Sequence, residues 1–377
     1  MLTNVMSAAS LILATIVSTA ALGQSPRQLP SGVSMQKDLT YAKIGDRELK
    51  LDLYLPKEAQ EPLPLVIWVH GGGWMGGSKN GCPARWLVSD GYAVASVEYR
   101  LSGEAIFPAQ IEDCKAAVRW LRANAGKYGI NPDQFGVWGS SAGGHLVSLL
   151  GTTSDSGEFN KGEHLDVSSR VQAVCDYYGP TDLLQMDVNA IPGARLKHLD
   201  PNSPESKLIG GPILENKAKA AKANPIEYIS EMTPPFLIVH GDADPTVAHY
   251  QSELLFEALK KAELPVHFHT IEGGGHGKGF GGAEVSDMVN QFFDRTLKSD
   301  QAVKHEAVMS HSKASESRSS RSSPMGRERR LTYEQVMARA DRNKDGQVTK
   351  EEFDGPPRLF PVLDRNQDGL LDREDFK

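Results

Sequence analysis

The chain has 377 residues, with 41 Lys and Arg against 48 Asp and Glu, and a formal net charge of −7. This acidic balance argues against a nucleic-acid-binding protein that depends on a strong overall positive field. Hydrophobic residues make up 40% of the chain and charged residues 24%, a globular composition that excludes wholesale disorder. Three cysteines, Cys82, Cys114 and Cys175, exclude a disulfide-rich scaffold and leave at least one thiol unpaired.

The N-terminus carries an uncharged run, Ala8–Gly23. This run is shorter than the roughly 20 apolar residues that span a bilayer, and its small residues suit signal-peptidase cleavage before Gln24. No Lys or Arg precedes the run, so it lacks the positively charged start that is typical of a signal peptide. The alternative is that the run forms an uncleaved anchor or a buried helix. We expect residues 1–23 to be a signal peptide, with the mature protein secreted or periplasmic, of bacterial type and without a membrane span.

The middle of the chain alternates strand-like and helix-like segments. Leucines at every second position of Glu48–Leu55 predict a half-buried strand. Short apolar runs bounded by turn residues predict buried strands of a mostly parallel sheet. These runs are Leu63–Val69, Tyr92–Tyr99, Phe135–Trp138, Val171–Cys175 and Phe236–His240. Ile111–Ala123 has apolar residues at helical spacing, with Cys114 on the buried stripe. We therefore expect a doubly wound α/β domain over residues 24–298, with its site at the carboxyl ends of the strands.

A Gly-x-Ser-x-Gly motif, Gly139–Gly143, directly follows Phe135–Trp138 and precedes a helix-compatible stretch. A nucleophile elbow needs small residues two positions before and after the serine, because the strand turns sharply into a helix. Ser141 meets this requirement, whereas Ser140 has Trp138 two positions before it. We predict that Ser141 is a nucleophile; a glycine-rich turn is the alternative.

Three consecutive glycines, Gly71–Gly73, stand shortly after the strand-like Leu63–Val69. Without Cβ atoms, their N–H groups can approach a substrate oxygen closely. We predict an oxyanion hole made by the N–H groups of Gly72 and Gly73, with the N–H of Ala142 as a further donor. A phosphate-binding loop is the alternative, but no Gly-Lys-Ser/Thr follows the glycines.

A serine nucleophile needs a base and an orienting acid, and this fold places them in the chain order Ser, Asp or Glu, then His. Val266–Ile271 alternates like a strand and leads to His276, which has glycines on both sides. We predict that His276 is the base. Phe236–His240 runs into a turn that offers Asp242 and Asp244; we favour Asp244 as the acid and expect Asp242 to shape the turn.

Other polar residues near the strand ends have structural interpretations. We expect His70 and His240 to hold loops through hydrogen bonds, and Asp182 to form a turn or helix cap. His145, next to the elbow, is a candidate to support the site from behind.

Six motifs together resemble those of α/β-hydrolase esterases: His70–Trp74, Glu98–Leu101, Phe107–Gln110, Trp138–His145, His240–Pro245 and Gly273–Gly277. The resemblance is strongest to the bacterial bifunctional feruloyl and acetyl-xylan esterase-like group, and more distant to the hormone-sensitive-lipase group. By this resemblance Ser141, Asp244 and His276 match the family triad. It also implies carboxylic-ester hydrolysis without a metal or organic cofactor.

The expected reaction is ester hydrolysis through an acyl-serine, on acetyl or feruloyl esters of carbohydrates. A lipase, an arylesterase or a peptidase with the same triad is one alternative, and a calcium-dependent interaction protein with a secondary hydrolase domain is another. Leu183–Ala223 is a long irregular insertion. It is either part of a lid or acyl pocket near the strand ends or a surface excursion.

The C-terminal quarter differs in composition. Residues 299–330 are rich in Ser, Lys and Arg and poor in large apolar residues, which predicts a flexible linker. We expect no nucleic-acid role for this basic segment. Residues 331–377 begin with the capping-box pattern Thr332–Gln335. A small α-helical EF-hand module is expected there, because two calcium-loop patterns follow.

Each 12-residue loop pattern places oxygen atoms at the positions that wrap a calcium ion. The predicted ligands are Asp341, Asn343, Asp345, the Gln347 carbonyl and Glu352 in the first loop, and Asp364, Asn366, Asp368, the Leu370 carbonyl and Asp375 in the second. Asp375 is shorter than Glu, so we expect weaker binding or magnesium there. The compact pair resembles the calcium repeats of bacterial secreted proteins, including dockerins. We expect this module to need Ca²⁺ in order to fold. The role considered for it is binding to a protein or to a cell surface.

Overall fold

The computed structural model describes residues 29, 31–59, 62–154, 156–194, 196–298, 347–349 and 370–372. The chain divides into two units, Met1–His311 and Ser312–Lys377, which are described separately. The predicted signal peptide and the predicted linker, residues 1–23 and 299–330, lie outside the described residues.

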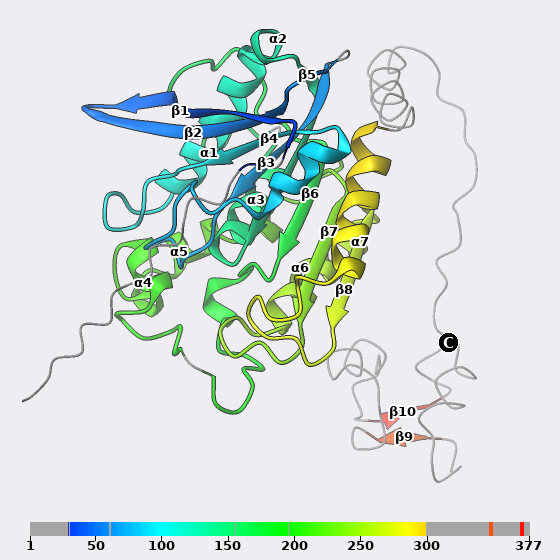
Figure 1. The fold of residues 1–377 in the computed structure, drawn as a ribbon. Helices are drawn as coiled ribbons and strands as arrows, with labels where there is room; N and C mark the ends of the chain where they lie inside the picture. Colours follow the sequence, from blue (N-terminus) through cyan, green and yellow to red (C-terminus); the bar gives the residue numbers. More distant parts are fainter. Residues whose placement is uncertain are drawn as a thin grey trace, which may run out of the picture. The chain divides into compact units, whose positions relative to one another are not determined.

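A mostly parallel sheet runs through the first unit (Figure 1). In the described residues its eight strands follow the order β1-β2-β4-β3-β5-β6-β7-β8. The β1–β2 and β2–β4 pairs are antiparallel, and all later neighbours are parallel. The strands are β1 (Val33–Ile44), β2 (Arg47–Pro56), β3 (Leu63–Val69), β4 (Ala93–Val97), β5 (Ile130–Ser140), β6 (Ala173–Tyr177), β7 (Phe236–Gly241) and β8 (Val266–Ile271).

Helices cover both faces of this sheet (Figure 1). They are α1 (Ala109–Ala123), α2 (Ala125–Tyr128), α3 (Ala142–Thr152), α4 (Pro204–Ile209), α5 (Lys217–Lys222), α6 (Tyr250–Lys261) and α7 (Ala283–Phe293). Shorter helical turns are η1 (Pro83–Asp90), η2 (Leu183–Gln185), η3 (Ile213–Glu215), η4 (Pro225–Tyr228) and η5 (Asp294–Lys298). The prediction of a doubly wound α/β fold is therefore confirmed.

The two-sided burial explains why the central strands read as unbroken apolar runs. Successive side chains of a strand point to opposite faces of the sheet. Leu65 and Ile67 of β3 join the core that contains residues of α1, α3 and α6. Val66 and Trp68 join the second core, with η1 and α7. Both faces of β3 must therefore be apolar, as the sequence pattern predicts.

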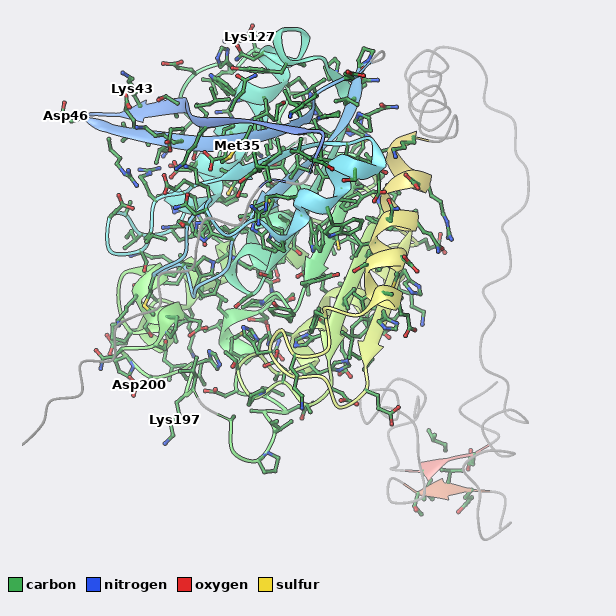
Figure 2. All side chains as sticks on the ribbon, viewed as in Figure 1. Met35, Lys43, Asp46, Lys127, Lys197 and Asp200 are labelled. Carbon is green, nitrogen blue, oxygen red and sulfur yellow. The ribbon has the colours of Figure 1, made fainter. Side chains whose placement is uncertain are left out.

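The β1–β2 hairpin carries Lys43 and Asp46 near its tip (Figure 2). Of the four alternating leucines of β2, those at positions 49, 51 and 53 are buried as predicted, and Leu55 is half-buried. The other face was expected to be exposed, and there the prediction is wrong: Asp52 is fully buried. Lys79 and Asp52 form an ion pair of 2.8 Å, which compensates the buried carboxylate, and η1 packs against β2.

All three cysteines are free and buried, and Cys114 lies on the inner side of α1 as predicted. None of the helices in the described part of the chain is long and apolar enough to cross a bilayer.

In the second unit, β9 (Val348–Thr349) pairs antiparallel with β10 (Leu370–Leu371). Val348 lies opposite Leu371, and both side chains are fully buried. These are the eighth residues of the two predicted calcium loops, so the pairing joins equivalent positions. Gln347 and Leu370 are described. The other predicted ligands lie outside the described residues: Asp341, Asn343, Asp345, Glu352, Asp364, Asn366, Asp368 and Asp375.

Candidate active site

Four parallel strands of the sheet bring the predicted site residues to one edge. The glycine-rich loop follows β3, Ser141 follows β5, Asp244 follows β7 and His276 follows β8. Parallel strands have their carboxyl ends on the same edge, so residues far apart in the chain meet there.

Ser141 stands in a sharp turn between β5 and α3, with φ 55° and ψ −124°. A non-glycine residue rarely adopts this backbone conformation, and such strain is held only where the surroundings enforce it. A Cβ on Gly139 would overlap the Gly143 carbonyl. A Cβ on Gly143 would overlap the Val69 carbonyl oxygen and lie 2.7 Å from the carbonyl oxygen of His70. The small residues of the motif therefore let the elbow pack directly on the end of β3.

The Ser141, His276 and Asp244 side chains form one continuous hydrogen-bonded chain. His276 Nε2 lies 3.1 Å from Ser141 Oγ, and His276 Nδ1 lies 2.8 Å from Asp244 Oδ2. The His276 side chain is 25% exposed, whereas the Asp244 side chain is fully buried. The serine is thus reachable from solvent, and the carboxylate that orients the histidine is shielded from it.

Asp244 is held by more than His276. Its Oδ1 accepts the N–H groups of Thr246 at 2.7 Å and Val247 at 3.0 Å, and its Oδ2 lies 3.3 Å from His240 Nε2. Burial alone would raise the pKa of Asp244, but the hydrogen bonds from His240, His276 and the backbone outweigh it and hold the pKa well below its usual range. Asp244 is therefore an anion at neutral pH.

Asp242 has a different position. It is exposed, and its Oδ1 accepts the backbone N–H of Gly273 at 2.7 Å. The structure therefore places Asp244 against His276, while Asp242 joins the two turns that carry Asp244 and His276.

The predicted oxyanion donors lie beside the serine. A Cβ on Gly71 would come within 3.2 Å of Ser141 Cβ, so the glycine loop packs on the elbow. Gly72 and Gly73 have φ values of 118° and 58°, which favour glycine. Neither of their N–H groups donates a hydrogen bond within the described residues. Ala142 is the first residue of α3, where backbone N–H groups have no partner inside the helix.

The neighbouring histidines hold loops, as expected. His70 stacks on Tyr99 with ring centroids 4.3 Å apart, and the Tyr99 hydroxyl donates to the His70 carbonyl. His240 Nδ1 lies 2.8 Å from Ser252 Oγ. His145 Nε2 lies 2.7 Å from the Ala223 carbonyl oxygen, which ties the elbow helix to the end of the insertion. Burial lowers the pKa of His145 to about 4, so it is neutral at pH 7.

Asp182 caps η2 by accepting the Leu184 N–H at 3.0 Å, so its predicted structural role is confirmed.

Sequence reasoning assigned no role to Tyr178. Its ring lies 4.6 Å from that of His276 and 4.7 Å from that of Phe280, measured between centroids. Tyr178 directly follows β6 and has a φ of 42°. A tyrosine just after a buried strand, at the edge that carries the site, was the available signal. Its packing restricts the orientation of the His276 ring.

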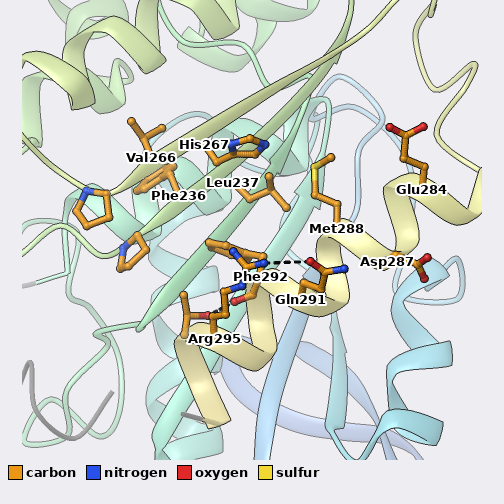
Figure 3. A pocket seen from close by; sticks show the side chains of 13 residues that line it. Phe236, Leu237, Val266, His267, Glu284, Asp287, Met288, Gln291, Phe292 and Arg295 are labelled. Carbon is orange, nitrogen blue, oxygen red and sulfur yellow. Dashed lines mark hydrogen bonds between the residues drawn. The ribbon is translucent and has the colours of Figure 1, made fainter. Parts of the chain in front are cut away.

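Two cavities have different relations to these residues. One, of about 830 Å³, lies between α7 and the beginnings of β7 and β8, with Phe236, Val266 and Met288 in its wall (Figure 3). Those strand beginnings are at the opposite edge from Ser141. Another, of about 570 Å³, lies beside the elbow. Six aromatic rings line it: Trp68, Trp86, Trp138, Tyr177, Tyr178 and Phe280.

The described residues contain no group of three or more His, Cys, Asp or Glu side chains arranged to hold a metal ion. The groups that the structure brings together at the sheet edge are the hydroxyl, imidazole, carboxylate and backbone N–H groups described above.

Known proteins resemble this chain in sequence and in fold. The family model described as BD-FAE matches residues 51–259, and an EF-hand model matches residues 334–354. The chain is 30% identical over 249 residues to the probable carboxylic ester hydrolase LipM of Mycobacterium tuberculosis. That alignment covers 62% of this chain and 56% of LipM, so the chain spans about half the length of the curated relatives it matches.

Solved structures whose titles name ester hydrolases also superimpose on this chain. A truncated carbohydrate esterase from gut microbiota superimposes with a TM-score of 0.63 at 33% identity, covering 71% of this chain and 97% of that one. An acetyl ester-xyloside bifunctional hydrolase from Caldicellulosiruptor lactoaceticus gives a TM-score of 0.57 at 26% identity, covering 73% of this chain and 98% of that one.

Proposed function

Because this chain belongs to the BD-FAE family of α/β-hydrolase esterases, we propose that it is a serine carboxylic-ester hydrolase working through an acyl-serine intermediate. The observation that carries the proposal is the contact chain from Ser141 Oγ through His276 to the buried carboxylate of Asp244. The esterase names of its relatives support it.

In the proposed mechanism, His276 Nε2 takes the Ser141 proton as the serine oxygen attacks the ester carbonyl carbon. Asp244 holds His276 as the tautomer whose Nε2 can accept that proton, and stabilises the imidazolium that forms. The N–H groups of Gly72, Gly73 and Ala142 then stabilise the carbonyl oxygen, which becomes negatively charged.

The tetrahedral intermediate collapses when the C–O bond to the alcohol breaks and His276 gives its proton to the leaving oxygen. In the second half, His276 takes a proton from water, and the resulting hydroxide attacks the acyl carbon. His276 returns that proton to Ser141 Oγ as the acid leaves. Atoms and charge balance without a cofactor.

For the substrate, we propose acetyl or feruloyl esters of carbohydrates. The neighbouring structures named as a carbohydrate esterase and an acetyl ester-xyloside hydrolase support the carbohydrate part. The cavity of about 570 Å³ supports an aromatic acyl group, because aromatic rings line it and Gly71, Ser140 and Tyr178 belong both to its wall and to the surroundings of the triad.

The remaining parts of the proposal rest on sequence patterns. We infer secretion or export to the periplasm from the leader-like residues 1–23. Calcium binding by residues 331–377 follows from the two loop patterns and is supported by the EF-hand match and by the pairing of Val348 with Leu371. The module would attach the enzyme to a protein or cell surface without entering the chemistry.

The experiment that tests the function combines turnover with active-site labelling. Wild-type protein should release the chromophore of a short acyl ester, and a serine-reactive phosphonate should abolish turnover by modifying Ser141, as located by peptide mass. Ser141→Ala should remove both turnover and labelling, whereas Ser34→Ala, on the edge strand β1, should change neither. Wild-type turnover by folded Ser141→Ala would refute the proposal.

The substrate class is tested separately with acetylated xylan, a feruloylated sugar and short-chain lipid esters. A higher kcat/KM for either carbohydrate ester supports the proposed class. A preference for the lipid esters would instead favour the lipase alternative.

A further inference from the structure

The insertion between η2 and α4 contains a buried histidine that contacts the loop of the catalytic acid. His198 is 4% exposed, although Lys197 and Asp200 beside it project outward (Figure 2). His198 Nε2 lies 2.7 Å from the carbonyl oxygen of Thr246. A buried imidazole at this distance from the backbone of a distant loop connects the insertion to that loop.

Thr246 belongs to the turn that holds Asp244. Its N–H donates to Asp244 Oδ1 at 2.7 Å, while its carbonyl oxygen faces His198 Nε2. The backbone of Thr246 is therefore bound on one side by the carboxylate that orients His276, and on the other side by His198. A displacement of Thr246 would move Asp244 as well.

The second nitrogen of His198 faces a carboxylate on α4. His198 Nδ1 lies 2.8 Å from Glu205 Oε1, and Glu205 is 2% exposed. The position of α4 is itself well defined: Ser203 caps it, and Phe107 N–H donates to the Leu208 carbonyl at 2.8 Å. The His198–Glu205 pair is thus anchored on α4. The contacts that fix α4 lie outside residues 242–247, the turn that carries Asp244 and Thr246, which we call the acid loop.

The same helix also contacts the oxyanion loop. A Cβ on Gly73 would come within 3.4 Å of Pro204 Cβ. Pro204 and Glu205 are consecutive residues of α4, so one helix packs against the oxyanion donors and reaches the acid loop through His198. The insertion is therefore not a mere surface excursion.

Both ring nitrogens of His198 face oxygen atoms, so the imidazole needs two protons. A carbonyl oxygen only accepts, so His198 Nε2 must carry a proton. A 2.8 Å contact between Nδ1 and a carboxylate oxygen needs a second proton, which an imidazolium supplies. Burial alone would lower the pKa of His198, but the hydrogen bond and the charge of Glu205 outweigh it and raise that pKa. Asp187, whose Oδ1 accepts the His198 backbone N–H at 3.0 Å, adds negative charge nearby.

We propose that His198 and Glu205 are positioning residues that hold the acid loop from the insertion and keep Asp244 aligned with His276. This inference rests on the proposed function of the triad. It assigns the insertion a part in catalysis through alignment, without contact between His198 and the substrate.

Two substitutions at position 198 separate the two contacts. Gln can place an amide N–H near the position of Nε2, and Asn near that of Nδ1. His198→Gln therefore keeps the donor to Thr246, whereas His198→Asn keeps only the donor to Glu205. Since a misplacement of about 1 Å can cost on the order of 10²-fold in rate, we expect kcat of His198→Asn to fall by roughly 10-fold to 100-fold. KM should change little, and His198→Gln should recover most of the lost kcat.

The split between kcat and KM distinguishes alignment from simple destabilisation. Misalignment lowers the turnover of enzyme that is folded and reacts with the phosphonate, whereas destabilisation lowers only the number of folded sites. Glu205→Leu removes the carboxylate that His198 Nδ1 contacts and offers no amide to take its place. We expect kcat for each phosphonate-reactive site to fall in Glu205→Leu, with KM little changed.

The experiment measures kcat and KM on a short acyl ester, with thermal unfolding and phosphonate titration to count folded active sites. His267→Asn, an exposed histidine of β8, is the matched control and should behave as wild type. Folded His198→Asn with wild-type kcat would overturn the inference. If His198→Asn does not fold, wild-type kcat for each phosphonate-reactive site of Glu205→Leu would overturn it. Absence of phosphonate labelling at Ser141 in wild type would instead refute the proposed function.

Discussion

Replacing Asp244 by Asn tests the orientation of the base with little change in shape. The Asn oxygen can still accept the N–H groups of Thr246 and Val247, which Asp244 Oδ1 accepts at 2.7 and 3.0 Å. The amide NH₂ then replaces Oδ2 and faces His276 Nδ1. Because an amide NH₂ only donates, His276 must place its proton on Nε2, the nitrogen that should accept from Ser141.

The magnitude follows from this reversed tautomer. In a serine protease triad the equivalent substitution lowers kcat by about 10⁴-fold with the geometry intact. At about 1.4 kcal/mol for each tenfold change, this corresponds to about 5.5 kcal/mol of lost transition-state stabilisation. We expect a loss of similar size here, because Asp244 is fully buried and contacts His276 Nδ1 directly.

The assay is kcat on a short acyl-chromophore ester, with phosphonate titration to show how many sites are assembled. Asp242→Asn is the matched control, because Asp242 is exposed and Asn keeps an acceptor for the Gly273 N–H. Asp242→Asn should stay within about tenfold of wild type, the size of a change worth about 1.4 kcal/mol. If Asp244→Asn retained kcat while Asp242→Asn lost it, the assignment of the acid would be reversed.

Three further predictions concern the elbow, a buried carboxylate and the tail. Gly143→Ala places a methyl group onto the Val69 carbonyl, an overpacking that costs about 3 kcal/mol, the upper end of the usual range. Soluble, phosphonate-reactive enzyme should therefore be lost, and an active, folded variant would contradict the packing. Burial raises the pKa of Asp176 from 3.8 to about 6. The folded state thus keeps this proton to higher pH, and stability present below pH 4 is lost as pH rises through 6. Asp176→Asn should therefore gain stability relative to wild type between those values in chemical denaturation, and a pH-independent difference would refute this. Calorimetry should show Ca²⁺ binding that Asp341→Ala weakens, and chelation should leave ester turnover unchanged; loss of turnover would contradict a purely accessory tail.

Local patterns predicted much of the fold. Leu63–Val69 and Val266–Ile271 were predicted with the bounds that the structure shows for β3 and β8. Apolar runs and alternation depend on which faces of a strand are buried, and that information is contained in neighbouring residues. Asp52 escaped this reasoning because its burial depends on Lys79, a partner from another segment.

The candidate site also combines residues that local sequence indicates with one that depends on a distant contact. Ser141 and His276 could be selected because each has a local signature: the elbow needs glycines at fixed positions, and His276 has glycines on both sides after a strand. Asp242 and Asp244 share one turn, and local sequence offered no more than a preference. The close contact with His276 distinguishes Asp244 from Asp242. That contact joins residues 32 positions apart in the chain.

By itself, the sequence determined the alternation of strands and helices in the middle of the chain, the choice of Ser141 and His276 as candidate nucleophile and base, and the two calcium-loop patterns, because each depends on spacing within a short segment. Only the tertiary structure decided which carboxylate meets His276 and which loop the insertion contacts. His198 and Thr246 are 48 positions apart, and no periodicity in either segment indicates that they touch. Their contact exists because packing brings the insertion against the turn that follows β7, and a contact of that kind is a property of the packed chain.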